Sequence, residues 1–297
     1  MTRALAIVNP AAGHGIASAE VGALLELLRR RFEGIDVVET GLEHPTAMEL
    51  GERAVRERYD VAIVAGGDGT TGDVARAIVG TDVTLGILPF GTFMNIARGL
   101  AIPRDDPRAA AEVIARSTMR KIDVGEVGGR LFFEAAGIGL DADMFRAGRA
   151  IQRGERSLAV DALRALLRRR SARVRIDVDG RVHTHRVLQA VVCDGPWYGW
   201  GFSVAPDATI DDGLLDLVIF GDSRWQVLRE AIAAAVEPDR AARGRRYRGR
   251  RITLSAARDL AVHADGVVVG NLPQTFTVRP GALRVFAPGA TSPVKRV

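Results

Sequence analysis

Short apolar runs alternate with amphipathic segments from the N-terminus to about Lys121. The runs predict strands at residues 4–8, 35–39, 61–65 and 85–88. Helical spacing or helix-forming composition predicts helices around residues 21–32, 46–58, 73–79 and 107–116. Strands that alternate with helices in this way form a parallel sheet wound by right-handed crossovers. The first part of the chain is therefore predicted to be an α/β domain with a Rossmann-like sheet.

The pattern changes after Lys121 to short β-rich runs separated by turn signals such as Asp179-Gly180. The predicted strands cover residues 122–127, 131–135, 174–178, 187–193, 215–220 and 252–254. Two helical stretches, residues 159–170 and 225–236, interrupt them. We expect a nucleotide-binding α/β domain over residues 1–121, which residues 283–297 could complete, and a β-rich antiparallel domain over residues 122–282.

A glycine-rich segment, Gly66-Gly67-Asp68-Gly69-Thr70, follows the apolar strand at residues 61–65 and precedes a helix. Glycines let the backbone pass close to a phosphate chain, and the next helix presents free N–H groups and the positive end of its dipole. Asp68 could hold Mg²⁺ through water or approach the hydroxyl that accepts a phosphoryl group. An ordinary strand-to-helix turn is the simpler alternative.

Two further loops follow predicted strands. Leu88-Pro89-Phe90-Gly91-Thr92 ends the fourth strand, and Asn9-Pro10-Ala11-Ala12-Gly13 ends the first. Each alone is a common turn. Ligands of doubly wound sheets bind beyond the carboxyl ends of the strands, so the three loops are expected to face one crevice. Together they predict a phosphate-binding site.

Composition narrows the function classes. The net charge is +5, and nearly all basic side chains are arginines, which can attract anionic surfaces. Lys121 and Lys295 are the only lysines and neither follows a glycine loop, which excludes a Walker-type P-loop. The single cysteine, Cys193, excludes an internal disulfide and fits a reducing cytoplasm. No apolar run approaches the roughly 18–20 residues that a membrane-spanning helix needs, and the N-terminus does not resemble a signal peptide.

The order of these motifs resembles the diacylglycerol kinase catalytic-domain family. That family includes bacterial lipid kinases and is related to sphingosine kinases, with NAD kinase and phosphofructokinase as more distant relatives. Similar segments continue along essentially the whole chain: residues 132–142, 206–216, 264–266 and 280–285.

The resemblance implies an ATP-dependent transfer of the γ-phosphoryl group to a lipid hydroxyl, diacylglycerol-like, in phospholipid metabolism. The residues that it would bring to the nucleotide are Asn9, Thr40, Gly66, Gly67, Asp68, Gly69, Thr70, Thr71, Gly72, Gly91 and Thr92. It also implies an acidic network of Asp68 and Asp123 around water and a catalytic Mg²⁺. A second, structural Mg²⁺ would be bound by Asp212 with backbone oxygens of Thr209 and Leu214, in keeping with hard oxygen ligation. A plain β-turn is the alternative for that loop.

The chain departs from the family pattern at several positions. Met94 and Asn95 replace an amide and a carboxylate, and Gly72-Asp73 stands where Asn-Glu is usual. Asp265-Gly266-Val267 replaces Asp-Gly-Glu, whose glutamate is the general base usually proposed in bacterial members. Phosphoryl transfer depends mainly on positioning and charge neutralisation, so another aspartate could serve as the base. We expect Asp68 rather than Asp265 in that role. The alternative is a catalytically weakened regulator that binds lipid or nucleotide.

Other enzyme classes fit the sequence less well. An NAD kinase would need a Gly-Ser/Thr-rich segment for its dinucleotide, and a phosphofructokinase would need clustered basic residues for a sugar phosphate. His183 and His185 lie two apart on a predicted surface strand and do not form a hydrolase or metalloprotease motif. No nucleic-acid-binding module is recognisable.

A kinase that acts on a lipid must reach its acceptor at the membrane surface. Arginines in residues 164–175 and 243–251 could attract anionic lipid, and the aromatic loop with Trp197, Tyr198 and Trp200 could lie in the interface. Arginines that solvate helix ends, and aromatics that line a cleft, are the simpler alternatives. We expect a cytoplasmic protein with peripheral contact at the inner membrane face, and a homo-oligomer is compatible with the sequence. The acceptor stays open between diacylglycerol, a sphingoid base, an isoprenoid alcohol and a glycolipid.

Overall fold

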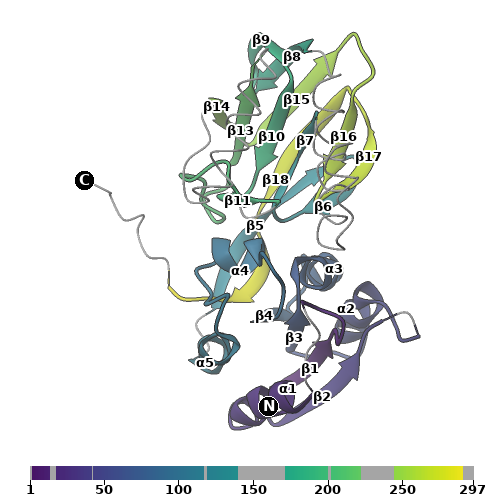
Figure 1. Ribbon diagram of the computed structural model, residues 1–297, viewed down its shortest axis with the longest axis vertical. Helices are drawn as coiled ribbons and strands as arrows, with labels where there is room; N and C mark the ends of the chain where they lie inside the picture. The colour runs from purple at the N-terminus through teal and green to yellow at the C-terminus, as the bar shows by residue number, and fades with distance from the viewer. Residues whose placement is uncertain are drawn as a thin grey trace. The chain divides into compact units, whose positions relative to one another are not determined.

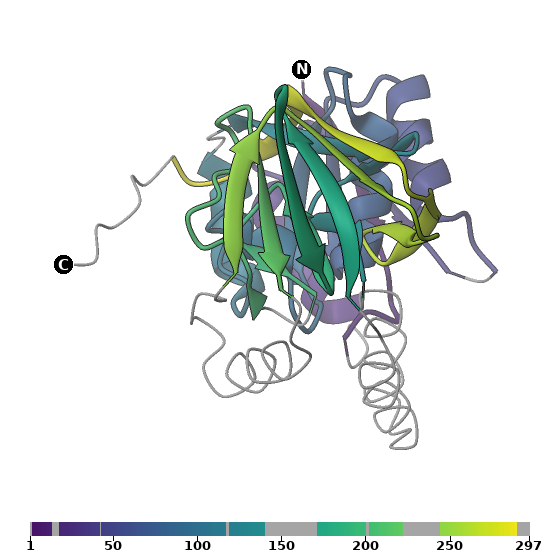
Figure 2. The ribbon, with the colours of Figure 1, turned by 90° about the horizontal axis from the view of Figure 1, so that it is seen from above.

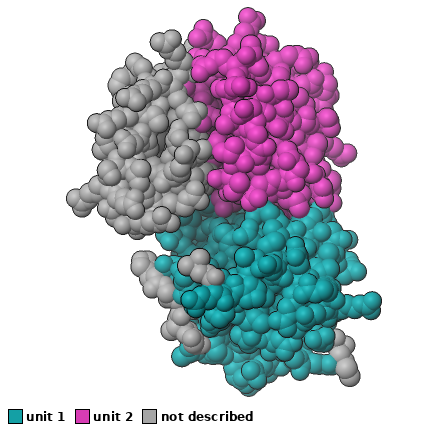
Figure 3. All heavy atoms as spheres, turned by 90° about the vertical axis from the view of Figure 1, so that its right-hand side faces the viewer, with its two compact units in different colours: residues 1–123, 281–297 teal, residues 124–280 magenta. Residues whose placement is uncertain are grey.

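The computed structural model describes residues 2–13, 18–41, 43–116, 119–139, 171–199, 202–221 and 244–289. The chain forms two compact units, shown in two colours in Figure 3. Unit 1 comprises Met1–Asp123 with Gly281–Val297, and unit 2 comprises Val124–Pro280. Strands β5 (Met119–Val127) and β18 (Gln274–Phe286) each contribute residues to both units.

Unit 1 alternates strands and helices along the sequence (Figure 1). Its other elements are β1 (Arg3–Val8), α1 (Ser18–Leu28), β2 (Gly34–Glu39), α2 (Ala47–Arg56), β3 (Val61–Gly66), α3 (Asp68–Ile78), β4 (Thr84–Pro89), α4 (Asn95–Gly99) and α5 (Pro107–Arg116). Its strands are ordered β2-β1-β3-β4-β18 and all neighbours are parallel. This is the predicted parallel α/β sheet.

The burial of these strands follows from their place in the sheet. Strands β3 and β4 are buried along their whole length, as expected for parallel strands with helices on both faces. Helices α1 and α5 share a core cluster with alternate side chains of β1 and β3, including Ala6 and Ile63. Helices α2 and α3 contact the sheet from the other face (Figure 1). Strand β2 lies at the edge and is mostly exposed.

Helices α2 and α3 pack closely because α2 has a glycine where it contacts α3. A Cβ atom on Gly51 would lie 2.6 Å from the Cβ of Ala77, so only glycine permits this spacing. Helix α2 begins with a capping box in which Thr46 and Glu49 exchange hydrogen bonds. Local signals and packing thus agree in placing α2 beside α3.

Unit 2 is built almost entirely of strands in its described residues. They are β6 (Arg130–Phe132), β7 (Ala135–Ile138), β8 (Ala172–Val178), β9 (Arg181–Val187), β10 (Gln189–Cys193), β11 (Trp197–Tyr198), β12 (Phe202–Ser203), β13 (Leu215–Phe220), β14 (Arg245–Gly249), β15 (Arg251–Ala256), β16 (Ala261–Ala264) and β17 (Val267–Asn271). Figure 2 shows several of them lying side by side, coloured teal to yellow.

Two antiparallel sets of strands enclose the core of unit 2. One has the order β18-β15-β8-β9, and the other has the order β14-β13-β10-β7-β16-β17. Their inner side chains form one cluster that includes Ile176, Leu217, Leu254 and Phe276. Alternating burial along β8 shows why the sequence takes this form: every second residue faces the cluster. The predicted antiparallel, β-rich second part is confirmed.

Several predicted elements differ in extent from the structure. Helix α3 begins at Asp68 rather than at residue 73, so Asp68 is the first residue of a helix and not part of a turn. The predicted strand at residues 131–135 is two strands, because the N–H groups of Phe133 and Glu134 donate to the carboxylate of Asp265 instead of a neighbouring strand. The predicted helices at residues 159–170 and 225–236 lie outside the described residues.

Candidate functional site

The three glycine-bearing loops meet at the carboxyl ends of the strands of unit 1. From β1 the chain adds β2 on one side and then crosses to β3 on the other, so β1 and β3 form the topological switch point of the sheet. The N–H of Asn9 donates to the carbonyl of Ala65, and the N–H of Phe90 donates to that of Gly66. These bonds continue the sheet past its strands and bring the loops together where ligands of such sheets bind.

Glycines make this close approach possible. A Cβ atom on Gly91 would lie 2.7 Å from the Cα of Gly67, closer than side chains tolerate. Gly13 adopts a left-handed φ of +61°, and a Cβ there would lie 2.5 Å from the carbonyl oxygen of Phe90. Around Gly69, by contrast, nothing lies within 4 Å of a Cβ position. The loops therefore pack on one another by backbone while Gly69 opens outward.

Helix α3 presents its N-terminus to this junction. Its N-cap, Gly67, has extended backbone and no side chain that could cap the first turn. The positive end of the helix dipole and the N–H groups of the first turn are thus directed to the loops rather than to a capping carboxylate or hydroxyl of the N-cap. Asn9 ties the first loop to this helix, since its Nδ2 donates to Oγ1 of Thr70 at 2.8 Å and its Oδ1 accepts from the N–H of Ala11 at 3.1 Å.

Asp68 is held in place by the neighbouring short helix. Its Oδ1 accepts a hydrogen bond from the N–H of Ile96 in α4 at 3.1 Å. Helix α4 is set by Met94, which is buried, has a left-handed φ of 49° and accepts the N–H of Gly91 at its sulfur, 3.2 Å away. The unusual Met94-Asn95 pair is therefore a packed support beneath the loops, with Asn95 also buried. Sequence reasoning missed this role because Met94 looked only like a departure from the family pattern.

The other predicted nucleotide residues of unit 1 lie along the same sheet edge or in the first turns of α3. Thr40 follows β2, and its N–H donates to the carbonyl of Val8, beside Asn9. Its buried hydroxyl donates to the carbonyl of Pro45 at 2.8 Å, so it shapes the loop before α2. Thr71 and Gly72 are buried in α3, whereas Thr92 is exposed at the surface.

Asp123 is a buried carboxylate at the end of the unit 1 part of β5. Its Oδ1 accepts the N–H of Gly281 in β18 at 2.8 Å. Both residues belong to unit 1. This bond joins two segments far apart in the sequence, which gives Asp123 a structural contact in addition to the role expected of it.

Asp265 belongs to unit 2 and acts on the backbone of a distant segment. It lies with Gly266 in the turn between β16 and β17, and both residues have positive φ, as type I′ hairpins require. Its carboxylate accepts the N–H groups of Phe133 at 3.1 Å, Glu134 at 3.1 Å and Ala135 at 3.4 Å. Asp265 is thus a clamp on the segment between β6 and β7. The next residue, Val267, is exposed in β17.

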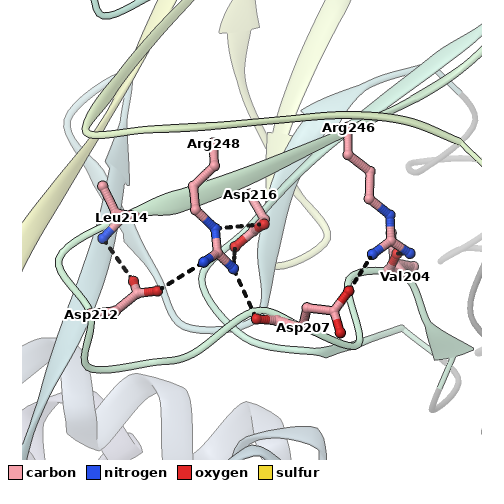
Figure 4. A network of polar contacts seen from close by, with 7 residues as sticks. All are labelled: Val204, Asp207, Asp212, Leu214, Asp216, Arg246 and Arg248. Carbon is pink, nitrogen blue, oxygen red and sulfur yellow. Dashed lines mark hydrogen bonds and ion pairs between the residues drawn. The ribbon is translucent and has the colours of Figure 1, made fainter. Parts of the chain in front are cut away.

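The predicted metal loop of unit 2 is held by arginines of β14 (Figure 4). Asp212 accepts the N–H of Leu214 at 3.0 Å and forms an ion pair with Arg248, whose Nη1 lies 3.4 Å from its Oδ2. Thr209 is exposed in the same loop. The pKa of Arg248 is raised, mainly by its hydrogen bond to Asp216 and further by the negative charges of Asp216, Asp212 and Asp207. Burial lowers this pKa, but by less than the hydrogen bond raises it. Within the described ranges, no group of three or more His, Cys, Asp or Glu side chains is placed to hold a metal ion.

Comparison with known proteins identifies the family. Residues 3–127 match the model of the diacylglycerol kinase catalytic domain, and residues 135–287 match that of the YegS C-terminal NAD kinase beta sandwich-like domain. A diacylglycerol kinase of Mycobacterium tuberculosis is 31% identical over 95% of this chain and 94% of its own length. The chain belongs to the diacylglycerol kinase family. Membership indicates a kinase, and the motifs at residues 66–70 and 88–92 lie in the part matched by the catalytic-domain model.

Further members of the diacylglycerol kinase family show the same extent of similarity. The diacylglycerol kinase of Bacillus subtilis is 28% identical over 93% of both chains. The crystal structure of a diacylglycerol kinase from Bacillus anthracis superposes with a TM-score of 0.75, at 21% identity, over 96% of this chain and 97% of that one. This likeness shows a common fold.

Residues 140–142 of the predicted family segment, the arginines between 164 and 170, Arg243 and Trp200 lie outside the described residues. Among the helices that the structure describes, none is long and apolar enough to cross a bilayer.

Proposed function

We propose that this protein is an ATP-dependent lipid kinase that transfers the γ-phosphoryl group of ATP to the hydroxyl of a diacylglycerol-like lipid. The observation that carries the proposal is the meeting of three loops at the N-terminus of α3, with Asp68 held there by the N–H of Ile96. Family membership and the names of the similar kinases support the lipid acceptor.

The nucleotide phosphates fit the junction of the loops. The first-turn N–H groups of α3, uncapped by Gly67, would donate to phosphate oxygens, and the helix dipole would favour their negative charge. The open space at Gly69 leaves room for the phosphate chain, whereas a side chain at Gly91 would collide with Gly67. Asn9 keeps the first loop in contact with Thr70 when the phosphates bind. Asp68 and Asp123 would hold Mg²⁺ through water, and the ion would neutralise charge on the phosphates.

Asp68 is the proposed general base. It would take the proton of the lipid hydroxyl as the oxygen bonds to the γ-phosphorus and the bond from that phosphorus to the β–γ bridging oxygen breaks, releasing ADP. The bond from Ile96 to Oδ1 fixes the orientation of the carboxylate. Asp265 is less suited, because its carboxylate already clamps three backbone N–H groups. The loose transition state of phosphoryl transfer makes positioning more important than a strong base.

The test is a transfer assay with purified protein, Mg²⁺ and labelled ATP against diacylglycerol, a sphingoid base, an isoprenoid alcohol, a glycolipid and NAD. Asp68→Asn should lower kcat by about 10²–10⁴-fold, the usual contribution of a general base, while ATP still binds. Asp82→Asn is the matched control, because Asp82 follows the same helix and its exposed carboxylate pairs with Arg284 at the surface; it should retain activity.

Three outcomes would count against the proposal. Equal activity of Asp68→Asn and the wild type would show that Asp68 is not the general base. Transfer of the phosphoryl group to NAD instead of a lipid would show that the proposed lipid acceptor is wrong. Nucleotide binding without transfer to any lipid would favour a regulator that has lost catalysis.

A further inference from the structure

The loop that precedes β13 in unit 2 lies against two arginines of the neighbouring strand β14 (Figure 4). Arg246 and Arg248 alternate along this strand, so their side chains leave it on the same face. Arg246 pairs with the carboxylate of Asp207 at 3.1 Å. Arg248 contacts Asp207 and Asp212 of the loop, and it also contacts Asp216, the residue opposite it in β13.

Each nitrogen of the Arg248 guanidinium contacts an oxygen, through a hydrogen bond at Nε and Nη2 and an ion pair at Nη1. Nε and Nη2 donate to the two carboxylate oxygens of Asp216 at 3.1 and 2.9 Å, the bidentate arrangement in which such pairs are strongest. Nη2 also donates to the backbone carbonyl of Asp207 at 2.8 Å, and Nη1 pairs with Asp212 at 3.4 Å. One side chain thus joins the beginning and the middle of the loop to the start of β13.

This arrangement conflicts with the structural Mg²⁺ that the family resemblance implies. Asp212 is the only side-chain ligand expected for that ion, and here its carboxylate is shared between the N–H of Leu214 and the positive charge of Arg248. A divalent cation on Asp212 would lie beside a guanidinium and be repelled by it. Mg²⁺ also demands nearly octahedral oxygen ligation, which a carboxylate engaged by a guanidinium does not readily offer. The residues present do not fit a resident divalent ion.

We propose that Arg248 is the built-in cation of this loop, and that its guanidinium orders residues 207–216 in place of a structural metal. The neutralisation that an ion would supply comes from a covalently attached charge, so the loop should stay ordered when divalent cations are removed. This inference concerns the stability of unit 2 and does not depend on the proposed kinase activity.

The experiment measures thermal unfolding of the full chain without nucleotide, in EDTA and in Mg²⁺. The wild type should melt at the same temperature in both. Arg248→Met should lower the melting temperature in EDTA by about 2–4 °C, since roughly 1 kcal/mol shifts a domain of this size by that amount. Arg250→Met is the matched control, because Arg250 is exposed and follows the same strand; it should melt like the wild type. In Arg248→Met the carboxylate of Asp212 no longer pairs with an arginine, so Mg²⁺ should restore part of the lost melting temperature. Adding Asp212→Asn should abolish that restoration.

Two results would overturn the inference. One is a Mg²⁺-dependent rise in the melting temperature of the wild type that Asp212→Asn removes, because it would show a metal on this loop. The other is equal melting of Arg248→Met and Arg250→Met in EDTA. If Arg248→Met fails to fold, Mn²⁺ binding to the wild type and to Asp212→Asn is measured by electron paramagnetic resonance. Mn²⁺ binding that Asp212→Asn eliminates refutes the inference, and Mn²⁺ binding that Asp212→Asn leaves unchanged supports it.

Discussion

Single glycines set how closely the candidate phosphate loops approach one another. Gly91 contacts the backbone of Gly67, and backbone cannot swing aside as the end of a flexible side chain can. Gly13 is restricted twice, by its left-handed φ and by the carbonyl of Phe90. At these positions the absence of a side chain is what allows the loops to form one surface, so their conformations depend on each other.

Substituting Gly91 by alanine should therefore damage the junction. The new Cβ would lie 2.7 Å from the Cα of Gly67 and from the sulfur of Met94, and one of the loops must move. Overpacking of this kind costs about 1–3 kcal/mol, so ATP affinity should fall by roughly 5- to 150-fold. Titration with a fluorescent ATP analogue measures the change. Gly22→Ala, in α1 where nothing lies within 4 Å, is the control and should bind like the wild type; equal affinity of both variants would show that the loops are not coupled.

A substitution at Val267 shows whether the chain lacks a general base. Val267 is exposed at the start of β17, where the family pattern has glutamate. If Asp68 accepts the proton, Val267→Glu should change kcat by less than about tenfold, well short of the 10²–10⁴ that a missing base would restore. The transfer assay with the preferred lipid measures this, with Val268→Glu as the control for added charge at the neighbouring position, which is also exposed. A gain of a hundredfold in Val267→Glu alone would contradict the role given to Asp68.

At the scale of elements, strands β9 and β14 carry a small aromatic cluster in unit 2. The rings of His183 and His185 are stacked with centroids 6.3 Å apart, and Tyr247 contacts both. The hydroxyl of Tyr247 shares a hydrogen bond of 2.6 Å with Nε2 of His185. Burial, followed by the charges of Arg245 and His183, lowers the pKa of His185 from its ordinary value.

This cluster should make stability depend on pH. Because the folded pKa of His185 lies below the unfolded value of about 6.5, the unfolded chain binds the proton first as pH falls through that value. The free energy of unfolding should therefore decrease below about pH 6.5, and less so in His185→Gln. Urea unfolding at pH 7.5 and at pH 5.5 measures the difference. His44→Gln, which replaces an exposed histidine beside Glu39, is the control and should keep the pH dependence of the wild type. An identical loss in His185→Gln would refute the assignment.

The elements differ in how well the sequence predicts them. Strands β1, β3 and β4 could be predicted because central parallel strands are continuous apolar runs. Strand β14 could not, since arginines occupy most of it. Strand β18 contains Pro280-Gly281 in its interior, a signal that normally marks a turn. The early start of α3 was hidden because Gly69 and Gly72 lie in its first five residues and Gly66 and Gly67 directly precede it.

The candidate site shows the same limit. The meeting of the loops at Asn9, Gly66 and Gly91 could be predicted, because the carboxyl ends of parallel strands share one edge. The clamp of Asp265 on Phe133 could not, since the partners are 132 residues apart and nothing local marks the pair. The hold of Arg248 on the loop at Asp212 is of the same kind. Whether Asp68 and Asp123 act in catalysis stays a prediction.

At the scale of the whole molecule, strand β18 serves both units. Its first residues pair with β15 in unit 2, while residues 281–286 lie parallel to β4 in unit 1. In unit 1 this second half buries Leu283, Val285 and Phe286, and its Gly281 binds the buried carboxylate of Asp123. Unit 1 is thus completed by residues that lie far from β1–β4 in the sequence.

Removing residues 281–297 should therefore destabilise unit 1 although the cut is far from β1–β4 in sequence. Each large buried side chain that is lost stabilises by about 1.5–3 kcal/mol, so the sum is comparable to the 5–15 kcal/mol that holds a typical domain folded. Hydrogen exchange should quicken most at the amides of β4 and of β5 up to Asp123, and less in the β8–β15 pair of unit 2. Removing only residues 290–297 leaves all of β18 in place and should cost much less. Equal protection of β4 in the two truncated proteins would mean that unit 1 folds without its last strand, and that Asp123 tolerates the loss of Gly281.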